Sequence, residues 1–534
     1  MQPFADKIRG AAQRAAQRQQ PDGPPRTRRE DLEAWAHSHL RGQKLVVVSN
    51  REPYSHVRDD DGVRWIRNAG GLTVALDAVS QTLGGLWVAH GSGNADRETA
   101  DDRGRIGCPP DRPRYVLKRV WLSAEDEALY YSGLANSALW PLCHVVYVRP
   151  RFRLRDWERY RDVNRRFAEA VLEEIGDEPA FVFLQDYHLA LAARFLKERR
   201  PDLEVALFWH IPWPNEEVFR IFPWKQELLE GMLANDLIGF HIRYHALNFL
   251  DAVSNELEAR VDHERIAVER GGKRTWVRHF PISVNATEIA AMSDGAEAQS
   301  AARALRQRFG IGEDGKIGLG VDRMDYTKGI PERLEAVERM LEKYPEWSGR
   351  FSFVQIGVPS RIELREYRNV QIRTRRRIDR INRRFGTPER PVAHLIEANL
   401  DFRELVPYYR VADLCAVTSL HDGMNLVAKE YLASKTDLSG ALVLSPFTGA
   451  ARELERAWLI SPYDREGMAD AYHRALSEPE DASRERMRAL RETVLRRNIF
   501  DWAIEVLNTA QRLTLRMPQS EALESEELGR SETP

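Results

Sequence analysis

The sequence predicts an α/β protein of two domains, each built around a parallel sheet, with ligands bound where the strands end. Three observations support this fold class. The chain has 534 residues, which is more than one hydrophobic core usually serves. Short β-rich apolar runs alternate with longer helix-like stretches, as in strand–helix–strand units. Polar residues follow the ends of many of these runs, where open α/β sheets bind their ligands.

The expected strands fall into two groups. Those of the first half are LVVVSN, GLWVAH, CHVVYV (residues 143–148), AFVFLQD, EVALFWH and DLIGFH. Helices are expected between several of them, as in DVNRRFAEAVLEEIG and HLALAARFLKERR. The rhythm restarts at KIGLGVD and continues through FSFVQIGV, VAHLIE, LCAVTS and ALVLSP. The break between the halves is therefore predicted near residues 281–285.

These patterns give a division of the chain into five parts. Residues 1–43 are polar and predicted to form a flexible N-terminal arm, although LEAWAHSHL within them is compatible with a helix. The first domain is expected over 44–283 and the second over 284–490. A C-terminal helix is expected over 491–515, packing back on the first domain. Residues 516–534 are acidic and predicted to be a tail.

Composition excludes several classes of function. Hydrophobic residues make up 43% and charged residues 30%, and the net charge of -2 provides no basic field for nucleic acid. The three cysteines lie far apart, which fits a reducing compartment and favours a cytoplasmic protein. No long apolar span predicts a membrane helix. The arginine-rich run RTRRRIDRINRRFG lacks interleaved aromatics and indicates an exposed helix face.

Metal motifs are weak in this sequence. HIRYH has histidines four residues apart, but it lacks the glutamate of HExxH. DDDG, at residues 59–62, is first of all a turn. No metal and no cofactor are therefore expected.

Polar and ionisable residues cluster after the predicted strands of both halves. Because parallel strands end at the same edge of their sheet, residues from both halves are expected to line a shared cleft. The set comprises Asn50, Arg51, Asp186, His210, His241, Arg323, residues 359–361, His421 and Asp422.

The segment GVDRMDYTKGIPERL predicts a phosphate clamp. A strand ends in Arg323, a loop carries Lys328, and a helix follows with Pro331 in its first turn. Two cations five residues apart, in front of a helix N-terminus, suit a bound anion. The alternative is a surface arginine paired with Asp322 or Asp325.

The segment SLHDGMNLVAKEYLAS predicts a second anion site. A turn with Gly423 precedes a helix that presents the backbone N–H groups of residues 425–427 at its positive end. Glu430 lies further along this helix and is suited to sugar hydroxyls, while Asp422 is suited to a second sugar. The alternatives are a solvated helix charge for Glu430 and a helix cap for Asp422.

Further candidates lie in the first half. LVVVSN delivers Arg51 at a strand end, and a charged loop then leads to the glycine pair at residues 70–71. YYSGLANSALWP places Tyr131 and Trp140 around a polar patch, although ordinary core packing also explains these aromatics. Asp186 is compatible with a helix cap. His210 precedes a stiff Pro-Trp-Pro segment, where a structural role is the alternative.

Together these motifs resemble the trehalose-6-phosphate synthase family of retaining glycosyltransferases, family 20. The resemblance runs from about residue 45 to 502 and rests on SNR, AGGL, YYSGLANSALWP, QDYHL, HIPWP, DRMDYTKGIPERL, PSR and DGMNLVAKEY. It implies a GT-B fold, in which two Rossmann-like domains face each other across a cleft. The first domain is then the acceptor domain and the second the nucleotide-sugar donor domain.

The resemblance also implies a role for each candidate residue. Arg323 and Lys328 correspond to the pair that holds the donor diphosphate. Asp186, His210 and Asp422 join them as the catalytic set, with Asp186 orienting the acceptor and the other two positioning the transferred sugar. The donor site then comprises Gly71, His210, Arg323, Lys328, Asp422, Gly423, Met424, Asn425, Leu426, Val427 and Glu430. The acceptor site comprises Arg51, Tyr131, Trp140, Asp186 and Arg361.

The reaction implied is transfer of glucose from UDP-glucose, or another NDP-glucose, to glucose 6-phosphate with retention and without a metal. A close cousin, the glucosylglycerol-phosphate synthases, makes glycerol 3-phosphate an alternative acceptor. A non-catalytic sugar-phosphate sensor is the alternative of another class. Gln185 departs from the family pattern, in which a histidine often stands before the aspartate of QDYHL. A homo-oligomer is left open.

Overall fold

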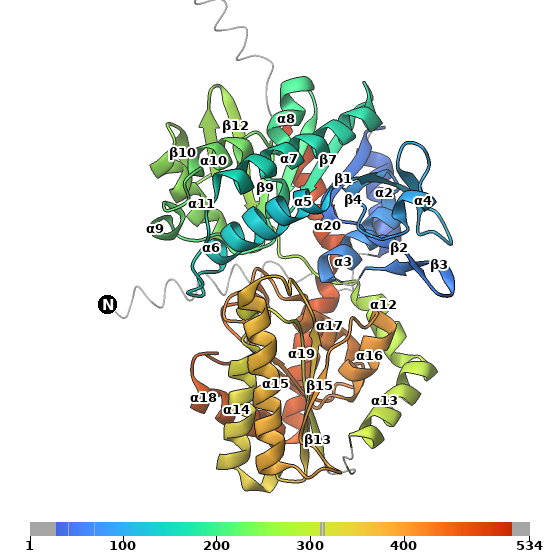
Figure 1. The fold of residues 1–534 in the computed structure, drawn as a ribbon, viewed down its shortest axis with the longest axis vertical. Helices are drawn as coiled ribbons and strands as arrows, with labels where there is room; N and C mark the ends of the chain where they lie inside the picture. Colours follow the sequence, from blue (N-terminus) through green and yellow to red (C-terminus); the bar gives the residue numbers. More distant parts are fainter. Residues whose placement is uncertain (1–27, 41, 69, 310–311, 313–314, 515–534) are drawn as a thin grey trace, which may run out of the picture.

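The computed structural model describes residues 28–40, 42–68, 70–309, 312 and 315–514, which form two α/β domains (Figure 1). The predicted acidic tail at 516–534 and residues 1–27 of the predicted arm lie outside the described residues. The first domain is drawn from blue to green in Figure 1, and the second from yellow to orange.

The first domain is built on a ten-stranded sheet with the order β10-β11-β12-β9-β8-β7-β1-β4-β6-β5. Its centre is parallel: Val46 of β1 pairs with Leu86 of β4 on one side and with Val182 of β7 on the other. The strands are β1 (Lys44–Arg51), β4 (Leu86–His90), β5 (Arg105–Cys108), β6 (Tyr115–Val120), β7 (Ala180–Gln185), β8 (Glu204–Phe208), β9 (Leu237–Phe240), β10 (Arg260–Asp262), β11 (Ala267–Arg270) and β12 (Lys273–His279).

The second domain is built on a six-stranded parallel sheet with the order β15-β14-β13-β16-β17-β18. Counted from β13, this is the 3-2-1-4-5-6 order of the Rossmann fold. The strands are β13 (Lys316–Arg323), β14 (Phe351–Val358), β15 (Ala393–Ile396), β16 (Leu414–Val417), β17 (Ala441–Leu444) and β18 (Trp458–Leu459). Their nearly continuous apolar sequences follow from burial on both faces.

Helices cover both faces of the two sheets. Those of the first domain are α3 (Gly71–Leu83), α4 (Asp96–Thr99), α5 (Ala124–Asp126), η1 (Glu127–Leu139), α6 (Trp140–His144), α7 (Leu154–Ile175), η2 (Tyr187–Leu189), α8 (Ala192–Arg199), α9 (Glu216–Phe219), α10 (Lys225–Leu233) and α11 (Arg243–Glu256). Those of the second are α12 (Ala286–Asp294), α13 (Ala296–Arg308), η3 (Tyr326–Lys328), α14 (Ile330–Lys343), η4 (Pro345–Trp347), α15 (Arg365–Phe385), α16 (Phe402–Val411), α17 (Leu426–Ser434), η5 (Gly449–Arg452), α18 (Arg465–Leu476) and α19 (Glu480–Arg496).

The last helix, α20 (Ile499–Thr514), leaves the second domain and packs on the first (Figure 1). It contacts α3, β8 and α2 (Arg29–His39). Trp502 of α20 is buried against two aromatic residues of the first sheet, with ring centroids 5.1 Å from Phe208 and 5.8 Å from Phe183. The C-terminal segment therefore ties the two domains together.

Three expectations from the sequence need correction. The predicted strand at residues 143–148 is absent, because its first two residues end helix α6 and Val145 then turns the chain with a φ of 52°. The charged loop before the glycine pair is a hairpin of β2 (Tyr54–Asp59) and β3 (Gly62–Arg67). Residues 29–39 of the predicted flexible arm form helix α2, and this helix packs against α20.

The arginine-rich run lies on α15, where its side chains pair with glutamates. Arg377, Arg380 and Arg384 all form ion pairs with Glu338 of α14. These pairs give the run a structural role in holding two helices together. Among the described residues, no helix is long and apolar enough to cross a membrane.

Candidate active site

The site lies where the strand order reverses in each sheet. In the first sheet the reversal falls between β1 and β7, which end at Arg51 and just before Asp186. In the second it falls between β13 and β16, which end at Arg323 and just before the 418–422 loop. Such switch points leave a crevice at the carboxyl ends of the strands.

The two crevices face each other and form one cleft. A cavity of about 330 Å³ is lined by every residue assigned to the donor and acceptor sites except Gly423. Of the other residues expected in the shared cleft, Asn50 and His241 line this cavity, whereas residues 359–360 and His421 do not. His421 instead lies against the first domain, with its Nδ1 2.7 Å from the His144 carbonyl.

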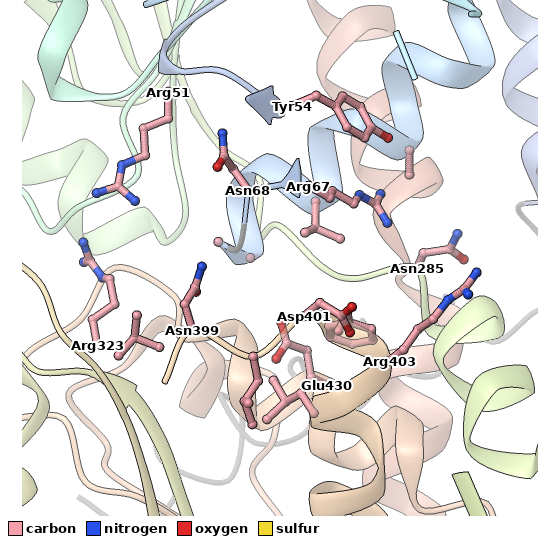
Figure 2. Close-up of a pocket in the computed structure, with 18 of the residues that line it drawn as sticks. Arg51, Tyr54, Arg67, Asn68, Asn285, Arg323, Asn399, Asp401, Arg403 and Glu430 are labelled. Carbon is pink, nitrogen blue, oxygen red and sulfur yellow. The ribbon is translucent and has the colours of Figure 1, made fainter. Parts of the chain in front are cut away.

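The smaller cavity adjoins a wider cavity of about 1800 Å³ that shares Arg51, Arg323 and Glu430 in its lining. Figure 2 shows the guanidinium groups of Arg51 and Arg323 facing each other across the wider cavity, with Glu430 further along the second domain.

Gly423 lies beside the cavity, at the contact between the domains. A Cβ atom at this position would collide with the backbone carbonyl of His210 in the first domain. Gly71 has a related place, because a Cβ there would lie 2.8 Å from the Cδ1 atom of Leu426 in the second domain. Both glycines therefore allow the domains to approach closely.

Lys328 and Asp422 form an ion pair in the cavity. The lysine Nζ lies 2.6 Å from Asp422 Oδ2, which also accepts hydrogen bonds from Asn425 Nδ2 at 3.2 Å and Ser419 Oγ at 3.1 Å. Burial opposes the ionisation of Asp422, but Lys328 more than offsets it, so the pKa of Asp422 lies well below its usual range. The expected helix-cap role belongs instead to Asn425, whose Oδ1 accepts from Ala428 N at 3.3 Å.

Arg323 projects from the end of β13 towards the aromatic wall of the first domain. Its guanidinium carbon lies 5.3 Å from the ring centroid of Trp140, and its Nη2 lies 3.9 Å from Asp325 Oδ2. The alternative pairing with Asp322 does not occur, because that carboxylate is bound to Arg333. Arg323 is thus held loosely beside Lys328 and the N-terminus of α17, where an anion would be attracted by all three.

Glu430 faces the cleft from within helix α17. Its Oε2 accepts a hydrogen bond from the Tyr409 hydroxyl at 2.7 Å, and burial raises its pKa. The tyrosine holds one carboxylate oxygen and thereby orients the other. This buried setting is unlike the solvated helix charge that was the alternative for Glu430.

A second cationic group gathers around Tyr131. The phenol oxygen accepts hydrogen bonds from Arg51 Nη2 at 3.0 Å and Arg361 Nε at 3.4 Å, and Arg361 also lies 4.7 Å from the Trp140 ring centroid. Burial would raise the pKa of Tyr131, but Arg361, Arg51 and Arg323 lower it to about 7. Because Arg361 comes from the second domain, this cluster forms only when the domains meet.

Asp186 and His210 hold each other in place through the backbone. Asp186 has a φ of 74°, and its Oδ1 accepts from Tyr187 N at 2.9 Å and His210 N at 3.2 Å. Burial raises the pKa of Asp186 to about 6, with partial compensation from these N–H groups. Burial also lowers the pKa of His210 well below its usual value, so the imidazole is neutral near pH 7. Its Nε2 lies 2.9 Å from Gln185 Oε1.

Tyr131 is positioned by a π-helix, η1, which sequence reasoning did not anticipate. The wider turn is marked by side-chain bonds that span five residues: Asn136 Nδ2 donates to the Tyr131 carbonyl at 2.7 Å, and Ser137 Oγ donates to the Ser132 carbonyl at 2.7 Å. π-Helical turns are rare and concentrate at functional sites. Lining residues that were not predicted include Gln185, Tyr187 and His188. All three belong to the QDYHL motif, so the motif itself was the sequence signal for them.

Comparison with known proteins places this geometry in context. Residues 43–512 match the family model described as glycosyltransferase family 20. The chain is 40% identical over 482 residues to a trehalose-6-phosphate synthase of Mycolicibacterium gilvum, covering 87% of this chain and 93% of that protein. It is 39% identical over 473 residues to a trehalose-6-phosphate synthase of Mycolicibacterium smegmatis, covering 87% and 92%.

Solved structures share the arrangement of the two domains. An α,α-trehalose-phosphate synthase (UDP-forming) from Burkholderia xenovorans, in complex with glucose-6-phosphate, superposes with a TM-score of 0.79 at 30% identity and covers 88% of this chain and 100% of its own. An E. coli structure described as bound with UDP-2-fluoro glucose superposes with a TM-score of 0.78 at 30% identity, covering 88% and 99%. The residues that match the family model, 43–512, include every residue of the candidate site.

Proposed function

This chain belongs to glycosyltransferase family 20, and we propose that it transfers glucose from UDP-glucose or another NDP-glucose to glucose 6-phosphate, giving α,α-trehalose 6-phosphate and NDP. The observation that carries the proposal is the meeting of two separate cationic groups in one cavity. One group contains Arg323 and Lys328, and the other contains Arg51 and Arg361. A donor diphosphate and an acceptor phosphate need two such groups.

The donor is held by the second domain. Its diphosphate lies against Arg323, Lys328 and the first amides of α17, which have no partners within the helix. Glu430, oriented by Tyr409, accepts hydrogen bonds from the ribose hydroxyls. Asp422 accepts from the glucose hydroxyls, and the neutral His210 completes the glucose site from the first domain.

The acceptor is held mainly by the first domain. Its phosphate binds Arg51, Tyr131 and Arg361, and Trp140 covers the sugar. Asp186 then orients the acceptor hydroxyl towards the anomeric carbon. Placing both substrates in one fixed geometry removes much of the entropic cost of a bimolecular reaction.

The chemical step follows from the charges. The bond from the anomeric carbon to the diphosphate oxygen breaks, and the bond to the acceptor oxygen forms on the same face of the sugar. The leaving diphosphate oxygen takes the acceptor's proton, so the carboxylate pair of a double displacement is not needed. Negative charge develops on the diphosphate, and the fixed cations Arg323 and Lys328 stabilise it together with the α17 dipole.

The comparisons support this acceptor over glycerol 3-phosphate and over a non-catalytic sensor, since the curated relatives are named trehalose-6-phosphate synthases. We place the activity in the cytoplasm. The three cysteines of the chain are free and buried, as in a reducing compartment.

The test is an assay of nucleoside diphosphate release with purified protein. UDP-, ADP- and GDP-glucose are each combined with glucose 6-phosphate, with glycerol 3-phosphate or with no acceptor. We expect release that depends on glucose 6-phosphate and a disaccharide phosphate product that retains the α configuration. Release no faster than without an acceptor would refute the proposal, and release with glycerol 3-phosphate alone would change the acceptor.

A further inference from the structure

A separate cavity lies outside the substrate cleft, where the two domains and the C-terminal segment meet at the hinge between the domains. Its volume is about 680 Å³, and we call it the hinge cavity. The first domain contributes the start of α11 and His279, the second contributes η5, and the C-terminal segment contributes Arg497 and Trp502. Its size is in the range of sites for small molecules.

The lining of the hinge cavity is rich in cations. Arg243, Arg452 and Arg497 line it from three different segments, together with His279. Within the described part of the chain, Arg243 and Arg452 make no ion pair or side-chain hydrogen bond. Burial lowers the pKa of His279, and the nearby charges of Arg243, Arg278 and Arg497 lower it further.

The carboxylates of the cavity are largely engaged elsewhere. Glu453 binds the buried Lys429, with Oε2 2.6 Å from Nζ, and its Oε1 lies 3.6 Å from Arg497. Asp501 Oδ2 accepts from the backbone N of Asn498 at 3.0 Å. Glu505 remains, and burial, followed by the neighbouring charges of Asp501 and Glu453, raises its pKa. Because Lys429 offsets the charge of Glu453, the three arginines outnumber the two other carboxyl groups of the lining, and the net charge around the cavity is positive.

Two further features of the hinge cavity suit a ligand that carries a phosphoryl group on an organic molecule. Helix α11 has 14 residues, and Ile242 at its N-terminus supplies no side-chain cap, so its first amides are available to an anion. Tyr244, which is 55% exposed, adds apolar surface to the lining, as do Leu247 and Trp502.

The hinge cavity shares a wall with the substrate cleft. His241 lines both cavities, and its ring centroid lies 5.1 Å from that of His210. On the opposite side, Gly449 lines the hinge cavity and is in close contact with the Gly423 carbonyl, while Gly423 itself packs against His210. A shift at the hinge would therefore be transmitted directly to the domain contact beside the transferred sugar.

We propose that the hinge cavity binds a small phosphorylated metabolite, and that this binding alters how the two domains close on the substrates. Arginine side chains grip phosphate oxygens in pairs, and here they come from both domains and from the C-terminal segment. A bound phosphate would bridge these three parts. Because the phosphate would bind one arrangement of the domains more tightly than another, its binding would shift the equilibrium towards the arrangement that it binds more tightly.

Direct binding tests the site without depending on catalysis. Inorganic phosphate and glucose 1-phosphate are titrated calorimetrically into the wild type, into the double variant Arg452→Gln, Arg497→Gln, and into the control Arg456→Gln, Arg496→Gln. The control arginines are exposed neighbours outside the cavity, paired with Glu485 and Glu492. We expect one class of sites to weaken by at least about tenfold in the first variant alone. Equal binding in all three proteins would overturn the proposal.

The two probes separate the sources of the phosphoryl group. Tighter binding of glucose 1-phosphate than of inorganic phosphate is expected, since the apolar wall contacts the sugar; equal affinities would assign the site to free phosphate. Thermal unfolding checks that the double variant is folded.

The coupling between the hinge cavity and the substrate cleft is tested by measuring kcat with both substrates saturating. The probe that binds more tightly should change kcat at least about twofold in the wild type and the control, but not in the double variant. An effect only on the KM of glucose 6-phosphate would overturn the coupling, because it indicates competition in the substrate cleft.

Discussion

Single residues in this cleft are held by partners that a substrate must share or replace. Lys328 is paired with Asp422 at 2.6 Å, and Arg323 is held loosely at 3.9 Å from Asp325. In the proposed complex, the donor diphosphate would meet one loosely held cation, Arg323, and one, Lys328, that also holds the Asp422 carboxylate. Such an arrangement is preorganised, because the charges are in place before the leaving group develops its own.

The first prediction concerns this pair of cations. Arg323→Ala or Lys328→Ala should lower turnover by at least about a hundredfold, because each removes a fixed charge at the leaving diphosphate. The measurement is kcat with both substrates saturating. Arg350→Ala, at an exposed arginine immediately before β14, serves as the control and should keep normal turnover. Near-normal rates in both site variants would exclude the clamp.

The second prediction concerns the pH dependence of acceptor binding. The pKa of Tyr131 is lowered to about 7, so the phenol loses its proton as the pH rises through that value. The resulting phenolate neutralises Arg51 and Arg361 and repels the acceptor phosphate. The KM for glucose 6-phosphate should therefore rise several-fold above about pH 7.

The variant Tyr131→Phe distinguishes titration of the Tyr131 phenol from titration of the acceptor phosphate. In the variant the KM for glucose 6-phosphate should be nearly independent of pH between about 7 and 9, because the titrating phenol is absent. The measurement is a KM profile for both proteins in one buffer series. A parallel rise in both would show that another group titrates.

At the scale of elements, three segments have structural roles that their local sequence does not predict. The π-helix η1 rotates Tyr131 into the cation cluster, and the β2–β3 hairpin replaces a loop at the cleft. Helix α20 crosses from the second domain to cover the first sheet. Its amphipathic pattern predicts a helix, but which surface it covers depends on the rest of the fold.

The third prediction concerns this crossing helix. Trp502→Ala should reduce the free energy of unfolding of the first domain by about 3 kcal/mol, because it leaves a cavity against Phe183 and Phe208. The measurement is the denaturant midpoint of the transition that includes the first domain. Arg512→Ala, on an exposed position of the same helix, is the control. Equal midpoints for the two variants would show that α20 does not stabilise the sheet.

At the scale of the whole molecule, the two sheets present their switch points to each other. The cation cluster around Tyr131 and the contact between Gly423 and His210 both require residues from two domains. The site is therefore complete only in the closed arrangement. Any opening of the domains would separate Arg361 from Tyr131.

The fourth prediction concerns this closure. Gly423→Ala places a Cβ atom against the His210 carbonyl, so the domains should stay further apart. We expect kcat to fall by at least about tenfold, since the two substrates are then misaligned. Small-angle scattering with both substrates present should show a larger radius of gyration than for the wild type. Gly312→Ala, which points into open space, is the control; identical behaviour of the two variants would contradict the role of Gly423.

The sequence by itself determined the α/β class, the two repeats of strand and helix, and most of the residues that line the cleft. These follow from local rules: apolar runs form buried strands, and polar side chains collect where parallel strands end. Motifs such as DYTKG and DGMNLVAKEY lie within single strand–loop–helix units, so their placement needs little long-range information.

Only the tertiary structure decided what depends on contacts between distant segments. The pairing of Lys328 with Asp422, the capture of Tyr131 by Arg51 and Arg361, and the hinge cavity all join residues far apart in the chain. The extra antiparallel strands at the edges of the first sheet and the course of α20 are likewise set by packing. Such contacts form because whole domains pack together, and no local pattern encodes the partner that a side chain will meet.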